Sequence, residues 1–239
     1  MKEVKNFQQM YRDGHVNRRE FLAAMGALGV TATTAGGLLT SASALAETPK
    51  KGGRLRFAWD QHGPADTLDP ALNTATIDYV RGRCYYNRLT QFNPDLSLRG
   101  DLAEEWSVNS NATEFTFKLR KGVTFHDGAD FTADDALYAM NRHLGADSIS
   151  KASSLVSMVS EWKKIDKYTI KAILSSPNAD LASILGTFHF NIVQNGAEGE
   201  YFQKPNATGP FTVEEFVPGV RSVGKRTPCL LYTSPRPRD

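Results

Sequence analysis

The fold is indicated most clearly by residues 102–135, which read LAEEWSVNSNATEFTFKLRKGVTFHDGADFTADD. Polar and apolar residues alternate up to Val108 and again from Phe115 to Leu119, and the turn formers Asn-Ser-Asn stand between the two runs. A period of two is typical of a strand with one buried face, and turn residues between two such runs indicate a hairpin. The sequence therefore predicts a hairpin whose Phe115, Phe117 and Leu119 face the core.

A helix is predicted to follow this hairpin from Phe131 onward. Thr132 is a natural N-cap, and Asp135 stands at the position that completes a capping box. Elsewhere the apolar patterns predict helical segments at 102–106, 153–162 and 178–185, and strands at 54–59, 168–174 and 211–216. Because helices and strands are mixed without a strict alternation, the predicted fold class is α/β with a mixed sheet.

The first 46 residues have the composition of an export leader. A polar stretch with Arg18-Arg19 precedes an uncharged run rich in Ala and Gly, and Ala44-Leu45-Ala46 supplies a cleavage pattern of small residues. The run NRREFL at 17–22 resembles the twin-arginine motif. We expect a signal peptide over 1–46, cleavage near Ala46 and a soluble periplasmic product. Weak hydrophobicity argues against the alternative, an uncleaved membrane anchor.

The net charge of +2 comes from the two ends of the chain. Residues 1–46 hold five basic against three acidic groups and residues 227–239 hold two against one, which leaves the middle of the chain at −1. The basic balance therefore predicts no nucleic-acid partner. The tail 227–239 contains three prolines and no apolar periodicity, so we interpret it as non-native; a native disordered terminus is the alternative. Pairing of Cys84 with Cys229, which lies in this tail, is left open.

Histidines are the candidate catalytic or metal-binding groups. His126-Asp127 has the composition of a general base with its carboxylate, but adjacent residues on an extended segment point to opposite faces, and Asp127-Gly128 is a turn signature. His62 lacks the second His or Cys pair that would complete a zinc site. We therefore predict no catalytic residue, no metal and no cofactor. The alternative function is a secreted hydrolase that uses His126 or His62 with a nearby carboxylate.

Four aromatic residues stand at the end of the first predicted strand or after it. Trp59, Tyr79, Tyr85 and Tyr86 would either line a ligand site at the end of that strand or belong to the core. Both interpretations are kept.

Taken together, these motifs resemble the family 5 extracellular solute-binding proteins, which are the dipeptide-, oligopeptide- and nickel-type receptors of ABC importers. The resemblance is strongest over 102–142, and shorter matches follow the family order at 52–57, 68–70, 176–180 and 208–211. It implies a periplasmic binding protein fold of two lobes that close on a ligand. Residues 47–226 match the first lobe with its extra subdomain, and the second lobe is missing.

The resemblance also implies a function and a site. The expected protein is not an enzyme; it binds a peptide or other small solute and delivers it to an ABC permease at the inner membrane, after export by the Tat translocase. Contacts from the family's first lobe come partly from the loop after the first strand, which here is Asp60-Gln61-His62. A dipeptide, a longer peptide, glutathione, an opine and a metal chelate all stay open as ligands.

Overall fold

A computed structural model describes residues 2–12, 15–30 and 52–227 of the chain. The chain divides into two compact units, residues 1–58 and 59–239, and each is described by itself. The predicted cleavage site near Ala46, the tail from residue 228 and Cys229 lie outside the described residues.

The first unit contains a pair of helices, α1 (Lys2–Arg12) and α2 (Arg18–Ala27). Asn17 caps α2 by accepting hydrogen bonds from the backbone of Arg19 and Glu20, and the Glu20 carboxylate accepts one from the Asn17 backbone in return. Phe21 and Met25 of α2 are fully buried, and apolar residues of the same unit pack against them: Val4, Phe7, Tyr11, Val16 and Val30. No helix in the described part of the chain is both long and apolar enough to cross a membrane.

The prediction of a strand at 54–59 is wrong. The segment has no regular secondary structure, and Leu55 and Phe57 are 76% and 77% exposed. A strand needs a neighbour to receive its backbone hydrogen bonds, and none of the described strands pairs with this segment. The segment therefore has the alternating apolar side chains of a strand but no described strand to hydrogen-bond with.

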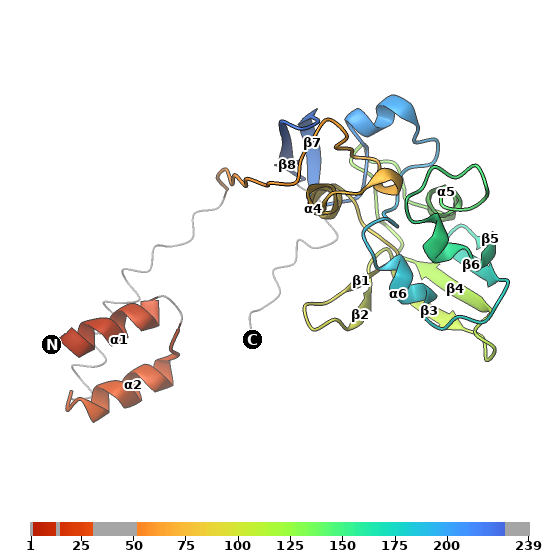
Figure 1. Ribbon diagram of the computed structural model, residues 1–239. Coiled ribbons are helices and arrows are strands. Elements are labelled where there is room, and N and C mark those ends of the chain that lie inside the picture. The colour runs from red at the N-terminus through yellow and green to blue at the C-terminus, as the bar shows by residue number, and fades with distance from the viewer. Residues whose placement is uncertain (1, 13–14, 31–51, 228–239) are drawn as a thin grey trace. The chain divides into compact units, whose positions relative to one another are not determined.

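The second unit is built around a four-stranded antiparallel sheet in the order β3–β4–β6–β5. Its strands are β3 (Ala103–Val108), β4 (Glu114–Leu119), β5 (Val159–Asp166) and β6 (Thr169–Leu174). The predicted hairpin is β3–β4, in which Trp106 lies opposite Phe117. Phe115, Phe117 and Leu119 are buried as predicted. Figure 1 shows α5 (Ala133–Asn141) packed beside β5 and β6.

Helix α5 begins as the sequence predicts. The Thr132 hydroxyl accepts a hydrogen bond from the Asp134 backbone at 3.3 Å, and the Asp135 carboxylate accepts one from the Thr132 backbone at 2.9 Å. The helix buries a stripe of small residues and one larger one against the sheet: Ala133, Ala136, Ala139 and Met140.

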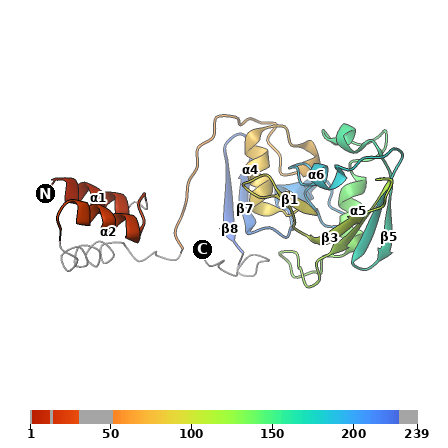
Figure 2. The same cartoon turned by 90° about the horizontal axis from the view of Figure 1, so that it is seen from below.

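The remaining elements lie beside this layer. They are η1 (Pro70–Leu72), α4 (Thr76–Tyr85), the ribbon of β1 (Thr90–Phe92) and β2 (Leu98–Gly100), α6 (Leu181–Leu185), η3 (Gly199–Gln203), and the ribbon of β7 (Phe211–Val217) and β8 (Arg221–Arg226). Figures 1 and 2 both show β7–β8 beside α4. Thus the fold mixes helices and strands as predicted, and every described ladder is antiparallel.

Three other local predictions differ from the structure. The helical turn predicted at 102–106 is not found, because residues 103–106 belong to strand β3. The segment 153–162 begins as the single turn η2 (Ser153–Val156) and continues as β5. The helix expected from Asn178 begins only at Leu181; Asn178 accepts a hydrogen bond from the Asp180 backbone at 2.7 Å. The strands predicted at 168–174 and 211–216 are confirmed as β6 and β7.

Candidate functional site

The predicted ligand residues lie on the exposed loop that leads from Trp59 to Asp66. Asp60, Gln61 and His62 all expose their side chains. The amide oxygen of Gln61 accepts a hydrogen bond of 2.7 Å from the hydroxyl of Thr76, the first residue of α4. This bond brings the loop against the N-terminal end of α4, so that polar side chains of the loop and of the helix are presented together.

The loop is anchored by Asp66, a buried carboxylate. Its oxygens accept hydrogen bonds from the backbone N–H of Gly63 at 2.9 Å, from Arg81 at 2.9 Å and from the backbone N–H of Gly219 at 3.3 Å. Burial by itself raises the pKa of Asp66, but these three donors outweigh it and lower that pKa below its ordinary value. Asp66 is therefore an ionised anchor, and it is not a group presented to a ligand.

Arg81 is the buried cation that balances this anchor. Its Nη1 lies 2.9 Å from Asp66 and 3.2 Å from Asp78, one turn earlier on α4. None of Asp66, Asp78 and Arg81 was predicted from the sequence as a site residue. The spacing of Asp78 and Arg81 at i and i+3 on a helix, following Asp66, is the signal from which the cluster could have been found.

The four aromatic residues weighed from the sequence differ in burial, and Trp59 is exposed and outside the core. Tyr85 and Tyr86 belong to the core, and the Tyr86 hydroxyl donates to the Leu68 carbonyl at 2.8 Å. Tyr79 is half-buried near the start of α4, where its ring stacks on Phe188 with centroids 3.6 Å apart. The core interpretation is therefore correct for Tyr85 and Tyr86. The hydroxyl of Tyr79 donates a hydrogen bond to the carbonyl of Thr74 at 3.2 Å.

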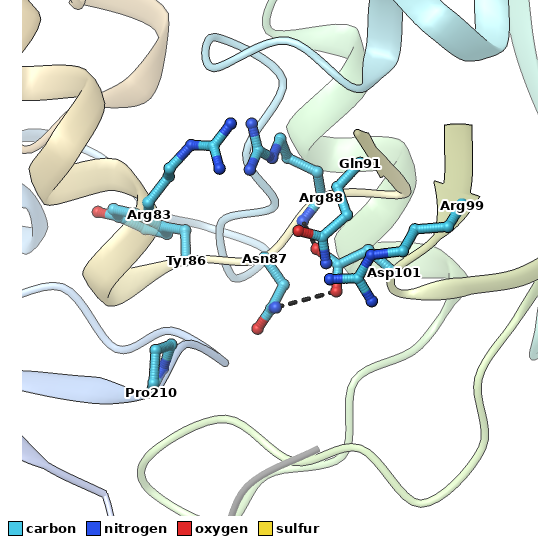
Figure 3. Close-up of a pocket in the computed structure, with 8 residues that line it drawn as sticks. All are labelled: Arg83, Tyr86, Asn87, Arg88, Gln91, Arg99, Asp101 and Pro210. Carbon is cyan, nitrogen blue, oxygen red and sulfur yellow. Dashed lines mark hydrogen bonds between the residues drawn. The ribbon is translucent and has the colours of Figure 1, made fainter. Parts of the chain in front are cut away.

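A polar pocket of about 160 Å³ opens near the other end of α4 (Figure 3). Asp101 organises it by accepting hydrogen bonds from the Asn87 side chain at 3.0 Å and from the Arg88 backbone at 2.9 Å. Its lining contains three arginines and one carboxylate, and consists of Arg83, Tyr86, Asn87, Arg88, Gln91, Arg99, Asp101 and Pro210. A ten-residue helix is about 15 Å long, so this pocket and the Gln61 loop are separate sites. Of its residues, only Tyr86 was weighed from the sequence.

The histidine singled out for hydrolysis has a structural role. His126 contacts the Gly209 carbonyl through Nε2 at 2.8 Å, and its Nδ1 accepts a hydrogen bond from the Ala207 backbone at 3.3 Å. Burial lowers the pKa of His126. Asp127 instead accepts from the Ala129 backbone at 2.9 Å and closes the predicted turn at Gly128. With both ring nitrogens engaged by the backbone, His126 has no nitrogen left to act as a base.

The remaining candidate groups for chemistry are the possible metal ligands and the cysteine thiol. No cluster of three or more His, Cys, Asp or Glu side chains suited to a metal occurs in the part of the chain that the structure describes. Cys84 is half-buried, and burial raises the pKa of its thiol.

Comparisons with known proteins agree on one family. The model of the bacterial extracellular solute-binding proteins, family 5 Middle, matches residues 97–235. The dipeptide-binding protein of Escherichia coli K12 is 29% identical over 182 residues, covering 64% of this chain and 34% of that protein. The glutathione-binding protein GsiB of Salmonella choleraesuis is 28% identical over 152 residues, covering 62% and 30%.

Solved structures show the same likeness. The periplasmic binding protein AgaA of A. tumefaciens R10 in complex with agropinic acid has a TM-score of 0.64 at 26% identity, over 69% of this chain and 34% of that one. DppA of Helicobacter pylori in complex with the peptide STSA has a TM-score of 0.60 at 25% identity, over 69% and 38%. The chain spans about a third of the length of the curated relatives that it matches.

Proposed function

Because the chain belongs to family 5 of the bacterial extracellular solute-binding proteins, we propose that it is the periplasmic substrate-binding component of an ABC importer. In this role it binds a peptide-like solute and delivers it to a permease in the inner membrane. The observation that carries the proposal is the match of the family over residues 97–235, more than half of the chain. The relatives named for dipeptides and glutathione support a small peptide as the ligand class.

The domain organisation proposed with this function has three parts. Residues 1–46 are a twin-arginine signal peptide that the Tat translocase recognises and that is cleaved near Ala46. Residues 47–226 form the first lobe, with the β3–β6 sheet and α5 as its extra subdomain. Residues 227–239 are a non-native tail.

The proposed ligand contacts are Asp60, Gln61 and His62. Their exposure supports this role, and so does the bond from Thr76, which holds Gln61 in one place. An ordered loop loses less conformational entropy on binding than a mobile one does. The hydrolase alternative keeps only His62 as its base, because both nitrogens of His126 are engaged by the backbone.

The site can be tested by nuclear magnetic resonance on the isotope-labelled chain. Alanyl-phenylalanine and, separately, glutathione are added to about 10 mM, which detects dissociation constants in the millimolar range. We expect amide shifts at residues 60–62 and at Thr76. Gln61→Ala should weaken binding roughly two- to tenfold through the lost hydrogen bond. Gln203→Ala, at an exposed glutamine of η3, is the matched control.

Two outcomes would contradict the proposal. One is the absence of amide shifts with either probe. The other is cleavage of the dipeptide in the same sample, which would favour the hydrolase.

A further inference from the structure

The turn that joins β7 to β8 touches the backbone of the candidate ligand loop. Gly219, in this turn, has a φ of +71°, and a Cβ added there would lie 2.9 Å from the carbonyl carbon of Gly63 and 3.2 Å from the nitrogen of Pro64. These are backbone atoms, which cannot swing aside as a flexible side chain can. The turn therefore approaches the loop so closely that only glycine fits without a shift.

One carboxylate holds this contact together. Asp66 accepts from Gly63 within the loop, from Gly219 in the turn and from Arg81 on α4. Its side chain is only 3% exposed, so that water does not substitute easily for a lost donor. Three segments that are far apart in the sequence thus meet at one buried charge.

Arg81 extends the same cluster to β7 and β8. Its Nε donates to the hydroxyl of Ser222 on β8 at 3.2 Å, and its guanidinium lies 5.2 Å from the ring centre of Phe216 on β7. The planar guanidinium presents donors in fixed directions, so it can bind Asp66 and Ser222 at once in a way that a lysine ammonium cannot.

We propose that Asp66, Arg81 and Gly219 form a positioning joint, through which the β7–β8 ribbon sets the placement of the Asp60–His62 loop. Arg81 and Gly219 are positioning residues: they act on ligand binding through the loop and touch no ligand themselves. The inference rests on the proposed function for its consequence, which is that ligand affinity depends on the ribbon. The mechanical part, loop placement, concerns the chain without ligand.

The test measures loop placement directly in the full chain. Tryptophan is replaced by 5-fluorotryptophan, and the fluorine signal of Trp59, next to the loop, is assigned with Trp59→Phe. Hydrogen exchange at the Gly63 amide reports its bond to Asp66. Gly219→Ala is compared with Gly122→Ala, because Gly122 has a similar φ of +75° but no atom within 4 Å of an added Cβ.

A second pair of variants addresses the guanidinium. Arg81→Lys keeps the positive charge but loses the planar guanidinium with its fixed donor directions, and Arg81→Gln loses both the charge and the guanidinium. The control is Arg83→Gln, at an exposed arginine two residues further along the helix. If Gly219→Ala does not fold, it is replaced by Ser222→Ala, which removes the hydroxyl that contacts Nε of Arg81 and the side chain of Tyr85.

We expect Gly219→Ala, or Ser222→Ala in its place, to shift the Trp59 signal and to speed exchange at Gly63 roughly tenfold. Arg81→Gln should do the same and Arg81→Lys less, while the two controls change neither readout. The proposed joint would be contradicted if Gly219→Ala and Gly122→Ala changed the stability equally and the fluorine signal of Trp59 did not move. Loop readouts that move while the affinity for alanyl-phenylalanine stays constant would overturn its role in binding. Failure of every variant and of the parent to bind the dipeptide would instead count against the proposed function.

Discussion

At the scale of single residues, the histidines of the second unit differ in what surrounds them. His143 is 2% exposed; its Nδ1 contacts the Ser150 hydroxyl at 2.7 Å and its ring lies 4.7 Å from that of Phe190. Burial, helped by the charge of Arg142, lowers the pKa of His143 from 6.5 to about 3. His62, in contrast, is exposed on the loop.

This burial predicts an acid sensitivity with a definite sign. Between pH 6.5 and 3 the unfolded chain has taken up a proton on His143 and the folded chain has not, so stability falls as the pH falls through this window. One proton corresponds to about 1.4 kcal/mol of unfolding free energy per pH unit. We expect His143→Gln to flatten the dependence of the unfolding free energy on pH, measured by urea denaturation between pH 6.5 and 4.

The matched control for this prediction is Gln203→Ala, which removes no titratable group and should leave the dependence on pH unchanged. His126 and His189, whose pKa values are also lowered by burial, contribute to the remaining slope. An identical slope in His143→Gln and in the parent would contradict the assignment.

The candidate site combines residues proposed from the sequence with residues that only the structure brings together. Asp60, Gln61 and His62 come from the resemblance to the family, and their contact with a ligand stays a prediction. Asp66 and Arg81 were not predicted, because a buried ion pair forms between a loop and a helix whose meeting depends on tertiary packing. Nothing in the local pattern near Gly219 indicates that its backbone will rest on Gly63.

At the scale of elements, the start of α5 is the clearest case in which local sequence determines structure. Thr132 and Asp135 exchange their capping hydrogen bonds as the sequence predicts. We expect Thr132→Ala to lower the unfolding free energy by about 1 kcal/mol, because the Asp134 N–H loses its partner. Thr132→Ser retains the hydroxyl and should stay within a few tenths of a kcal/mol of the parent in urea denaturation. Equal stabilities of the two variants would show that the cap contributes nothing.

Other elements show where local patterns fail. The β3–β4 hairpin was predictable because its two alternating runs are close in sequence and pair with each other. The segment 153–162 has apolar residues at spacings that suit a helix, but pairing with β6 places Trp162 opposite Ala172 and makes its second half a strand. The segment 54–59 has the alternation of a strand and lacks a partner among the described residues. Pairing with a neighbouring strand decides both cases: the end of 153–162 pairs with β6, and 54–59 has no partner among the described strands.

At the scale of the whole molecule, the two units have separate apolar cores. The larger core draws its residues from Leu68 to Val213, and the smaller one consists of Phe21 and Met25 with the residues packed around them. The charge is divided in the same way, because residues 1–46 supply a surplus of two positive charges and the middle of the chain is at −1. The proposed leader thus has a separate small core and a charge of opposite sign, which supports the proposal that it is removed after export.

This separation leads to a prediction on stability and export together. A chain that lacks residues 2–46 keeps the larger core intact, so its melting temperature should lie within about 2 °C of the parent's. Phe117→Ala is the reference for a damaged core, since deleting a buried ring costs about 3–5 kcal/mol and should lower the melting temperature by at least about 6 °C.

The export prediction uses a host that contains the translocase. There the shortened chain and the double variant Arg18→Lys with Arg19→Lys should both stay in the cytoplasm, as cell fractionation measures. Arg12→Lys, which changes a leader arginine outside the motif, should be exported like the parent. Export of the double variant would refute the twin-arginine assignment, and a loss of stability in the shortened chain comparable to that of Phe117→Ala would refute the separation of the two units.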